Sequence, residues 1–261
     1  MTGATLRFPG PGGILIVSLW AFLAPMVGRA DGLAVPGDPE FQQVLAIYQG
    51  RADPDRHREA WEGFARLAAL RTGDHDVQIW CARTSFHLAH RRIQAGDKED
   101  GARIARAGIE CALRAQALRT RDYDGRYWEL MNRYKAGATL PFTRILQAVK
   151  PVRGQLEELI AMDPRRPEAY VFLAMAYREL PSVISWGDDD KALEYARMGV
   201  DRAPGDPEAL LELAEACRET GDRECALRYY EAVIQAKAPS GLEWETDDAR
   251  NWARRQMRKV R

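Results

Sequence analysis

The segment that most constrains the fold is residues 207–239, PEALLELAEACRETGDRECALRYYEAVIQAKAP. Its apolar residues recur at helical spacing on both sides of a short TGD turn, which predicts two antiparallel helices. Ala214 and Ala226 are small residues that let the two helices approach closely, and a proline ends the unit. The pattern recurs in residues 167–207 and more weakly in residues 77–118. Such units fold as stacked hairpins, because one hairpin alone cannot bury its apolar face.

The spacing within these units is that of a tetratricopeptide repeat. We therefore expect an all-α, tetratricopeptide-like helical-hairpin solenoid over residues 41–240, followed by a C-terminal capping helix over residues 241–261. The capping helix begins with acidic residues and ends with basic ones, as the helix dipole favours. Gly, Pro and Asp residues mark the turns between the expected helices.

Residues 1–30 differ in composition from the rest of the chain. A basic residue is followed by the apolar run 14–27 and then by GRADG, which is the pattern of a secretory signal peptide. We expect cleavage after Ala30, so that Asp31 becomes the first residue and residues 31–40 form a linker. The alternative is an uncleaved membrane anchor, but the apolar run is shorter than the roughly 20 residues that a spanning helix needs. We therefore expect an exported, periplasmic or secreted protein without a stable membrane anchor.

Charge and motif content argue against several classes of function. Lys and Arg together number 38, as do Asp and Glu, so no strong field favours nucleic acid, which we do not expect as a partner. His87 and His90 share a helical face, but two arginines follow them, so we expect hydrogen-bonded or solvated histidines and no metal site. The sequence contains no nucleophile elbow, phosphate loop or HExxH motif. We expect no catalytic residue, no cofactor and no enzyme activity.

Two hairpins depart from the regular pattern, and they are neighbours in the sequence. In residues 122–162 the first helix is aromatic and the turn is long and apolar, and Pro151 should break the second helix after Val149 or Lys150. In the next unit the insert PSVISW, residues 181–186, places apolar side chains in a turn, where polar residues are usual.

The order of these units resembles a known family. A Gly-rich helix (GIECALRA) precedes an aromatic one (YWELMNRYKAG), and Leu180-Pro181, a short apolar segment and Gly187-Asp188 follow. Over residues 77–237 this order is similar to the tetratricopeptide T-component proteins (TatT-type) linked to bacterial TRAP transporters, and to the eukaryotic microtubule-dynamics regulators. The resemblance implies a protein partner, such as a periplasmic solute-binding protein, and a role in small-molecule uptake. Members of the family are often lipoproteins, whereas this sequence has no lipid-accepting cysteine directly after the apolar run 14–27.

The candidate partner- or ligand-binding residues come from the two irregular hairpins. They are Trp128, Tyr134, Phe142, Ile184 and Trp186. Aromatic anchors give contact area and specificity, whereas the regular repeats use Leu and Ala. We expect Ile184 and Trp186 to pack toward residues 137–146 and to form one apolar site with Leu140 and Phe142. The first hypothesis is a binding or scaffold protein that holds a protein partner. The alternative is a soluble ligand-holding protein with a pocket for an apolar small ligand between these hairpins.

Export makes disulfides permissible for the four cysteines. Cys217 and Cys225 flank the turn of the 207–239 unit, where a bridge is within reach and two free thiols are the alternative. Cys81 and Cys111 are expected to be free, small and buried, as cysteines in helices usually are.

Overall fold

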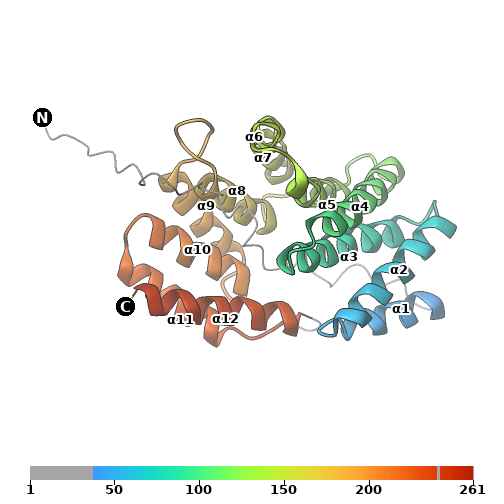
Figure 1. Cartoon of the computed structure of the whole chain (residues 1–261). Coiled ribbons are helices and arrows are strands. Elements are labelled where there is room, and N and C mark those ends of the chain that lie inside the picture. Colours follow the sequence, from blue (N-terminus) through green and yellow to red (C-terminus); the bar gives the residue numbers. More distant parts are fainter. Residues whose placement is uncertain (1–37, 240–241, 261) are drawn as a thin grey trace, which may run out of the picture.

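The chain is built from helices joined by turns and short loops. The computed structural model describes residues 38–239 and 242–260, and no strand occurs in those ranges. The predicted signal peptide, the linker up to residue 37 and the side chain of Phe142 lie outside the described part. The predicted all-α solenoid of helical hairpins is confirmed (Figure 1). The regular hairpins are α1 (Pro39–Gln49) with α2 (Pro54–Leu70), α3 (His75–Gln94) with α4 (Lys98–Leu118), α8 (Glu168–Glu179) with α9 (Asp189–Arg202), and α10 (Pro207–Glu219) with α11 (Arg223–Gln235).

Aspartates start most of these helices. In each case the carboxylate accepts a hydrogen bond from a backbone N–H of the first turn, which has no partner within the helix. The capping residues are Asp38, Asp53, Asp74, Asp97, Asp188, Asp206 and Asp222. Each such cap is worth about 1 kcal/mol, so the aspartates of the predicted turns fix where the helices begin.

Glycine closes two of the tight turns. Gly96 and Gly221 have φ angles of 90° and 79°, in the left-handed region that other residues rarely adopt. After Gly221 the backbone N–H of Asp222 donates to the carbonyl of Cys217 at 2.9 Å, which satisfies a free carbonyl at the end of α10. The AGD and TGD sequences are therefore the stop signals of α3 and α10.

The hairpin between α4 and α8 is irregular, as the sequence predicts. Its first helix, α5 (Tyr123–Ala136), runs into a single 3-10 turn, η2 (Gly137–Thr139). Its second half is divided into α6 (Phe142–Val149) and α7 (Val152–Met162). Pro151 lies between them, so the predicted break after Val149 or Lys150 is confirmed, and α6 ends at Val149. None of the described side chains of α6 is fully buried.

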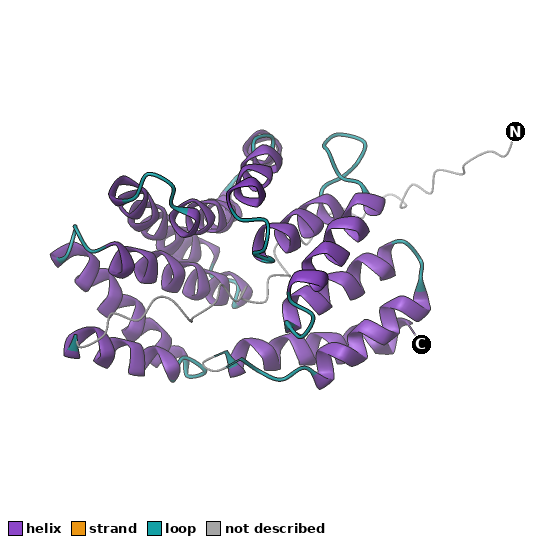
Figure 2. Ribbon diagram, turned by 180° about the vertical axis from the view of Figure 1, so that it is seen from behind, coloured by secondary structure: helices purple, strands orange, loops and turns teal. Residues whose placement is uncertain are grey.

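The first helices of successive hairpins lie side by side and form the inner layer of the solenoid. α3 contacts α5, α8 contacts α10, and α10 contacts α12 (Glu243–Val260). The Tyr48 hydroxyl of α1 reaches His87 of α3, and Tyr134 of α5 packs on Phe172 of α8. The predicted capping helix, α12, covers α10 and α11, and its first turn also reaches the α1–α2 turn. Figures 1 and 2 show the result as a curved stack whose two ends meet.

Candidate functional site

The insert between α8 and α9 is a closed loop with a fixed base. The backbone N–H of Asp188 donates to the carbonyl of Tyr177 at 2.9 Å, which joins the two ends of the loop. Gly187 lies directly against the end of α8, because a Cβ built on it would be 1.7 Å from the carbonyl oxygen of Leu180. Only glycine allows this approach, so the sequence holds the loop in one shape.

Trp186 attaches this loop to the neighbouring irregular hairpin. Its indole N–H donates to the carbonyl oxygen of Val149 at 3.1 Å, at the end of α6. Its ring meets the ring of Tyr177 edge to face, with 4.9 Å between the centroids. The two irregular hairpins are therefore in contact, and the hydrogen bond between them is made at Val149, just beyond the expected segment of residues 137–146. The indole is half-buried.

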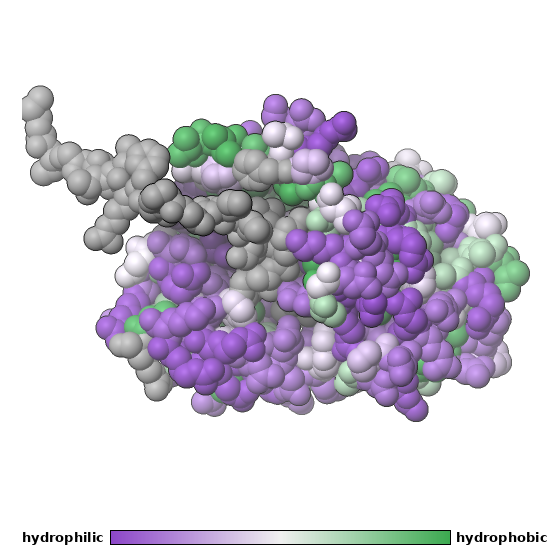
Figure 3. All heavy atoms as spheres, viewed as in Figure 1, coloured by the Kyte–Doolittle hydropathy of each residue, from purple (hydrophilic) through white to green (hydrophobic). Residues whose placement is uncertain are grey.

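The tip of the loop points into water. Val183 is 89% exposed and Ile184 is 56% exposed. Ile184, which was predicted to pack toward the neighbouring hairpin, is an exposed residue, and Trp186 makes the hydrogen bond to α6. Figure 3 shows the loop as a hydrophobic patch at the upper left of the molecule.

We name one surface the apolar ridge. It consists of Val183 and Ile184 at the loop tip, Leu140 before α6, and the half-buried α6 residues Ile145, Leu146 and Val149. Leu140 is 41% exposed. The α6 part of the ridge and the loop part are connected where the Trp186 indole N–H donates to the carbonyl oxygen of Val149.

Of the predicted binding residues, Trp128 is buried and Tyr134 is half-buried. Trp128 is 2% exposed and packs against Phe86 and His87. Its side chain is therefore not accessible to a partner, contrary to the prediction. Tyr134 is half-buried, its hydroxyl donates to Glu179 at 3.4 Å, and its ring packs on Phe172. These aromatic side chains fill the wide hairpin from inside.

A buried ion pair joins the two ends of the solenoid. Arg51, in the turn after α1, donates from Nε and Nη2 to the two carboxylate oxygens of Glu245 in α12, at 2.6 and 2.5 Å. Both side chains are 2% exposed. His87 Nδ1 lies 2.6 Å from the Tyr48 hydroxyl and 3.6 Å from the same carboxylate. We call the Arg51–Glu245 pair with His87 the latch.

The latch has a distinct electrostatic state. Burial alone would raise the pKa of Glu245, but His87 and Arg51 hold that pKa at about 2. Burial lowers the pKa of His87 to about 4, so its ring is neutral near pH 7. The sequence gives no signal for the pair, because its members are 194 positions apart.

Further polar side chains lie on the inner helices. Lys135 of α5 places Nζ 2.9 Å from His90 Nδ1, and burial lowers the pKa of Lys135 to about 7. Glu179 of α8 has its pKa raised to about 8 by burial, against the opposing effect of Arg178. Arg178 itself holds Glu212 of α10 through two bonds, at 2.9 and 3.1 Å. His90 is thus hydrogen-bonded, one of the two states expected from the sequence.

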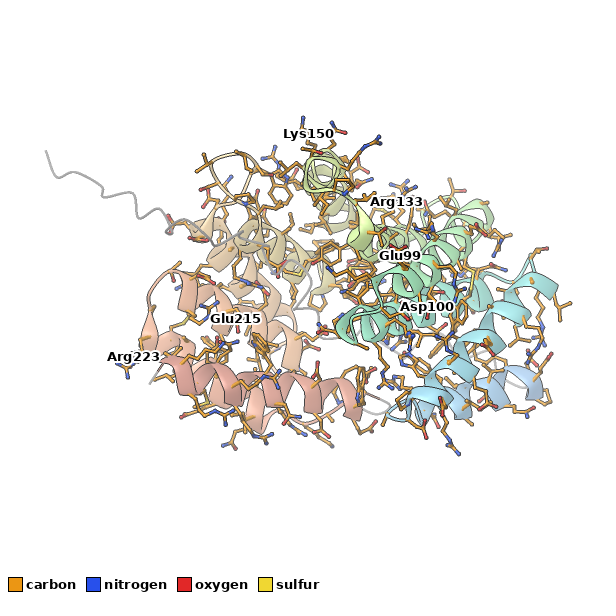
Figure 4. All side chains as sticks on the ribbon, viewed as in Figure 1. Glu99, Asp100, Arg133, Lys150, Glu215 and Arg223 are labelled. Atoms are coloured by element: carbon orange, nitrogen blue, oxygen red, sulfur yellow. A yellow bond between two sulfur atoms is a disulfide. The ribbon has the colours of Figure 1, made fainter. Side chains whose placement is uncertain are left out.

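A second set of polar contacts fixes α12 to the last repeat. Glu215 of α10 accepts from the Tyr230 hydroxyl at 2.8 Å and from the Trp252 indole N–H at 2.7 Å. Figure 4 shows Glu215 of α10 above the helices α11 and α12. One carboxylate thereby ties α10, α11 and α12 together.

All four cysteines are paired. Cys217 and Cys225 form a disulfide across the turn of the last hairpin, the bridged alternative of the two considered. Cys81 and Cys111 form a second disulfide between α3 and α4, with their Cα atoms 6.0 Å apart. The expectation of free thiols at Cys81 and Cys111 is wrong, because the close packing of α3 on α4 brings the two side chains into register.

The cavity described between α4, α5 and α7 does not match the predicted apolar pocket. It has a volume of about 140 Å³, and six of its eight lining residues are polar or charged. The lining residues are Gln116, Arg126, Glu129, Leu130, Arg133, Gln155, Glu158 and Leu159. None of the predicted binding residues is among them.

Two further searches of the described residues gave negative results. None of their helices combines the length and the hydrophobicity needed to cross a bilayer. Within the same ranges, no group of three or more His, Cys, Asp or Glu side chains is placed to hold a metal ion.

Comparison with solved structures supports the fold. The crystal structure of TTC0263, a thermophilic TPR protein in Thermus thermophilus, superposes with a TM-score of 0.57 at 18% identity, over 80% of this chain and 98% of that one. The chain has a tetratricopeptide-repeat fold. The crystal structure of MamA matches with a TM-score of 0.43 at 16% identity, over 81% of this chain and 97% of that one. No protein-family profile and no curated protein sequence matches the chain.

Proposed function

We propose that this protein is an exported binding module that holds a protein partner on the apolar ridge. The observation that carries the proposal is the loop of residues 181–187, in which Val183 and Ile184 are exposed to solvent. A backbone hydrogen bond between Asp188 and Tyr177 closes the loop. The resemblance to TRAP-associated T-components favours a periplasmic solute-binding protein as the partner and small-molecule uptake as the process.

The energetics favour a binding role for the loop. Leaving a large aliphatic side chain in water forgoes about 1.5–3 kcal/mol of burial. A turn without a role would be polar, yet this one exposes two apolar side chains. Gly187 and Trp186 keep the loop in place, so the exposed residues do not fold back onto the protein.

The ridge has the character of a hot spot within a larger interface. A stable interface buries at least about 1,000 Å² in total, and a few central residues carry most of its energy. Arg144 and Lys150 are exposed beside the ridge on α6, and Figure 4 shows Lys150 at the outer end of that helix. We therefore expect a partner surface with an apolar centre and an acidic rim.

The proposal is tested with the TRAP solute-binding protein of the same organism, titrated calorimetrically with the mature chain. We expect the double variant Val183→Ser, Ile184→Ser to bind at least about tenfold more weakly, the loss of about 1.4 kcal/mol or more. Its melting temperature should equal that of the wild type. Leu70→Ser is the matched control, because Leu70 is 72% exposed on α2, outside the ridge. Absence of a complex, or equal affinity of the double variant, would contradict the proposal.

Export is tested separately by the mass of the protein isolated from the periplasm. We expect a chain that begins at Asp31. Full-length chain recovered in the membrane fraction would contradict export.

A further inference from the structure

The inner layer of the solenoid contains a guanidinium without a counter-charge. Arg83 of α3 is 2% exposed, and its Nε and Nη1 have no hydrogen-bond partner among the described residues. Nε carries one N–H and Nη1 carries two, so more than half of the donors of this side chain are unsatisfied. A buried charge in this state destabilises the fold.

The carboxylate of the latch is already paired with another arginine. Glu245 gives both of its oxygens to Arg51. The Arg51 guanidinium lies over the Tyr48 ring, 4.2 Å from its centroid. Arg51 and Arg83 both lower the pKa of Tyr48 against the burial that raises it, and Arg83 does so in part through a side-chain hydrogen bond. Two positive charges, Arg51 and Arg83, and one negative charge, Glu245, therefore act on Tyr48.

Neighbouring groups add unsatisfied polar atoms of their own. His57 is fully buried with neither ring nitrogen hydrogen-bonded, and Nε2 of His87 is also without a partner within the described chain. The rings of His57 and His87 lie 6.0 and 6.1 Å from the ring of Tyr48. Burial lowers the pKa of His57 well below its usual value, so it is neutral and offers one donor and one acceptor.

Arg83 is held in a fixed orientation. Its guanidinium lies over the ring of Trp80, 4.8 Å from the centroid. Stacking on an aromatic face fixes the plane of the guanidinium and leaves its edge free for a planar or tetrahedral oxyanion. A preorganised arginine of this kind is the usual receptor for carboxylate and phosphate groups.

We propose that Arg83, together with His57 and His87, forms an internal site for the carboxylate or phosphate group of a small molecule. The site is on the inner helices and is independent of the apolar ridge, so either proposal can fail without the other. Because Arg83 is almost fully buried, a ligand reaches it only when the neighbouring side chains or the latch move.

The test is equilibrium dialysis of the mature protein, which is insensitive to slow entry. Butyrate and inorganic phosphate are the two anionic probes, and butyramide is the neutral control; ionic strength is kept constant with chloride. We expect saturable binding of one anion and none of butyramide. Arg83→Gln should weaken that binding at least tenfold and Arg83→Lys should weaken it less, because lysine keeps the charge and loses the planar fork.

Arg92→Gln is the matched control, since it removes the same charge from the same helix at a residue paired with Asp97. In the absence of anion, Arg83→Gln should melt no lower than the wild type, because it removes an uncompensated buried charge. Two results overturn the proposal. One is the absence of saturable binding of either anion, which leaves internal water as the partner of Arg83. The other is unchanged anion affinity in Arg83→Gln with a lower melting temperature, which makes Arg83 a structural residue.

Discussion

The latch makes a quantitative prediction for Glu245→Gln. In the folded protein the pKa of Glu245 is lowered from 4.5 to about 2. At 1.36 kcal/mol per unit, this shift corresponds to roughly 3 kcal/mol of stability at pH 7. Removing one partner of a buried ion pair costs about 3–5 kcal/mol, because the other charge stays buried. The two figures agree.

Thermal unfolding followed by circular dichroism at pH 7 measures this cost. For a domain of this size, 1 kcal/mol shifts the melting temperature by about 2–4 °C, so we expect a decrease of about 6–12 °C. Asp247→Asn is the control, because Asp247 is an exposed α12 residue paired only with Arg250 in the described contacts, and exposed pairs contribute about 0–1 kcal/mol. A melting temperature of Glu245→Gln within 1 °C of the wild type would refute the buried latch.

Two further predictions concern the disulfides and the response to acid. Loop-closure entropy gives about 4 kcal/mol for Cys81–Cys111, with a separation of 30 residues, and about 2–3 kcal/mol for Cys217–Cys225, with a separation of 8. We therefore expect the serine pair at Cys81 and Cys111 to lower the free energy of unfolding more, and equal losses would contradict this. The pKa of His87 falls from 6.5 to about 4 on folding, so its neutral form is the one that the fold stabilises. Its contribution is present above pH 6.5 and is lost as the pH falls to 4, by roughly 3 kcal/mol. Denaturant melts between pH 7 and 4 should show this decrease, and His87→Gln should reduce it; an identical slope in both proteins would exclude His87 as its source.

The features set by local sequence could be predicted. Spacing of apolar residues and Gly, Pro and Asp turns locate the helices, and Pro151 separates α6 from α7 as expected. The insert at residues 181–186 was recognisable because its apolar side chains are unusual in a turn. Its attachment through Trp186 to the preceding hairpin follows from the neighbouring positions of the two irregular units.

Features that depend on how distant hairpins meet could not be predicted. Arg51 in its turn and Glu245 in its helix look like ordinary surface residues, and only the closure of the solenoid buries them together. The Cys81–Cys111 bridge requires the register of α3 against α4, which apolar spacing does not define. Trp128 was expected at a surface because it belongs to an irregular hairpin, but the width of that hairpin requires a large side chain in its core.

Hydrogen–deuterium exchange with and without the TRAP solute-binding protein tests the central claim most directly. The free chain should exchange rapidly in the loop of residues 181–187, which lies outside the helices. On complex formation we predict protection of this loop and of α6, with little change in α2. Protection confined to other helices, with the loop unchanged, would contradict the assignment of the apolar ridge as the docking surface.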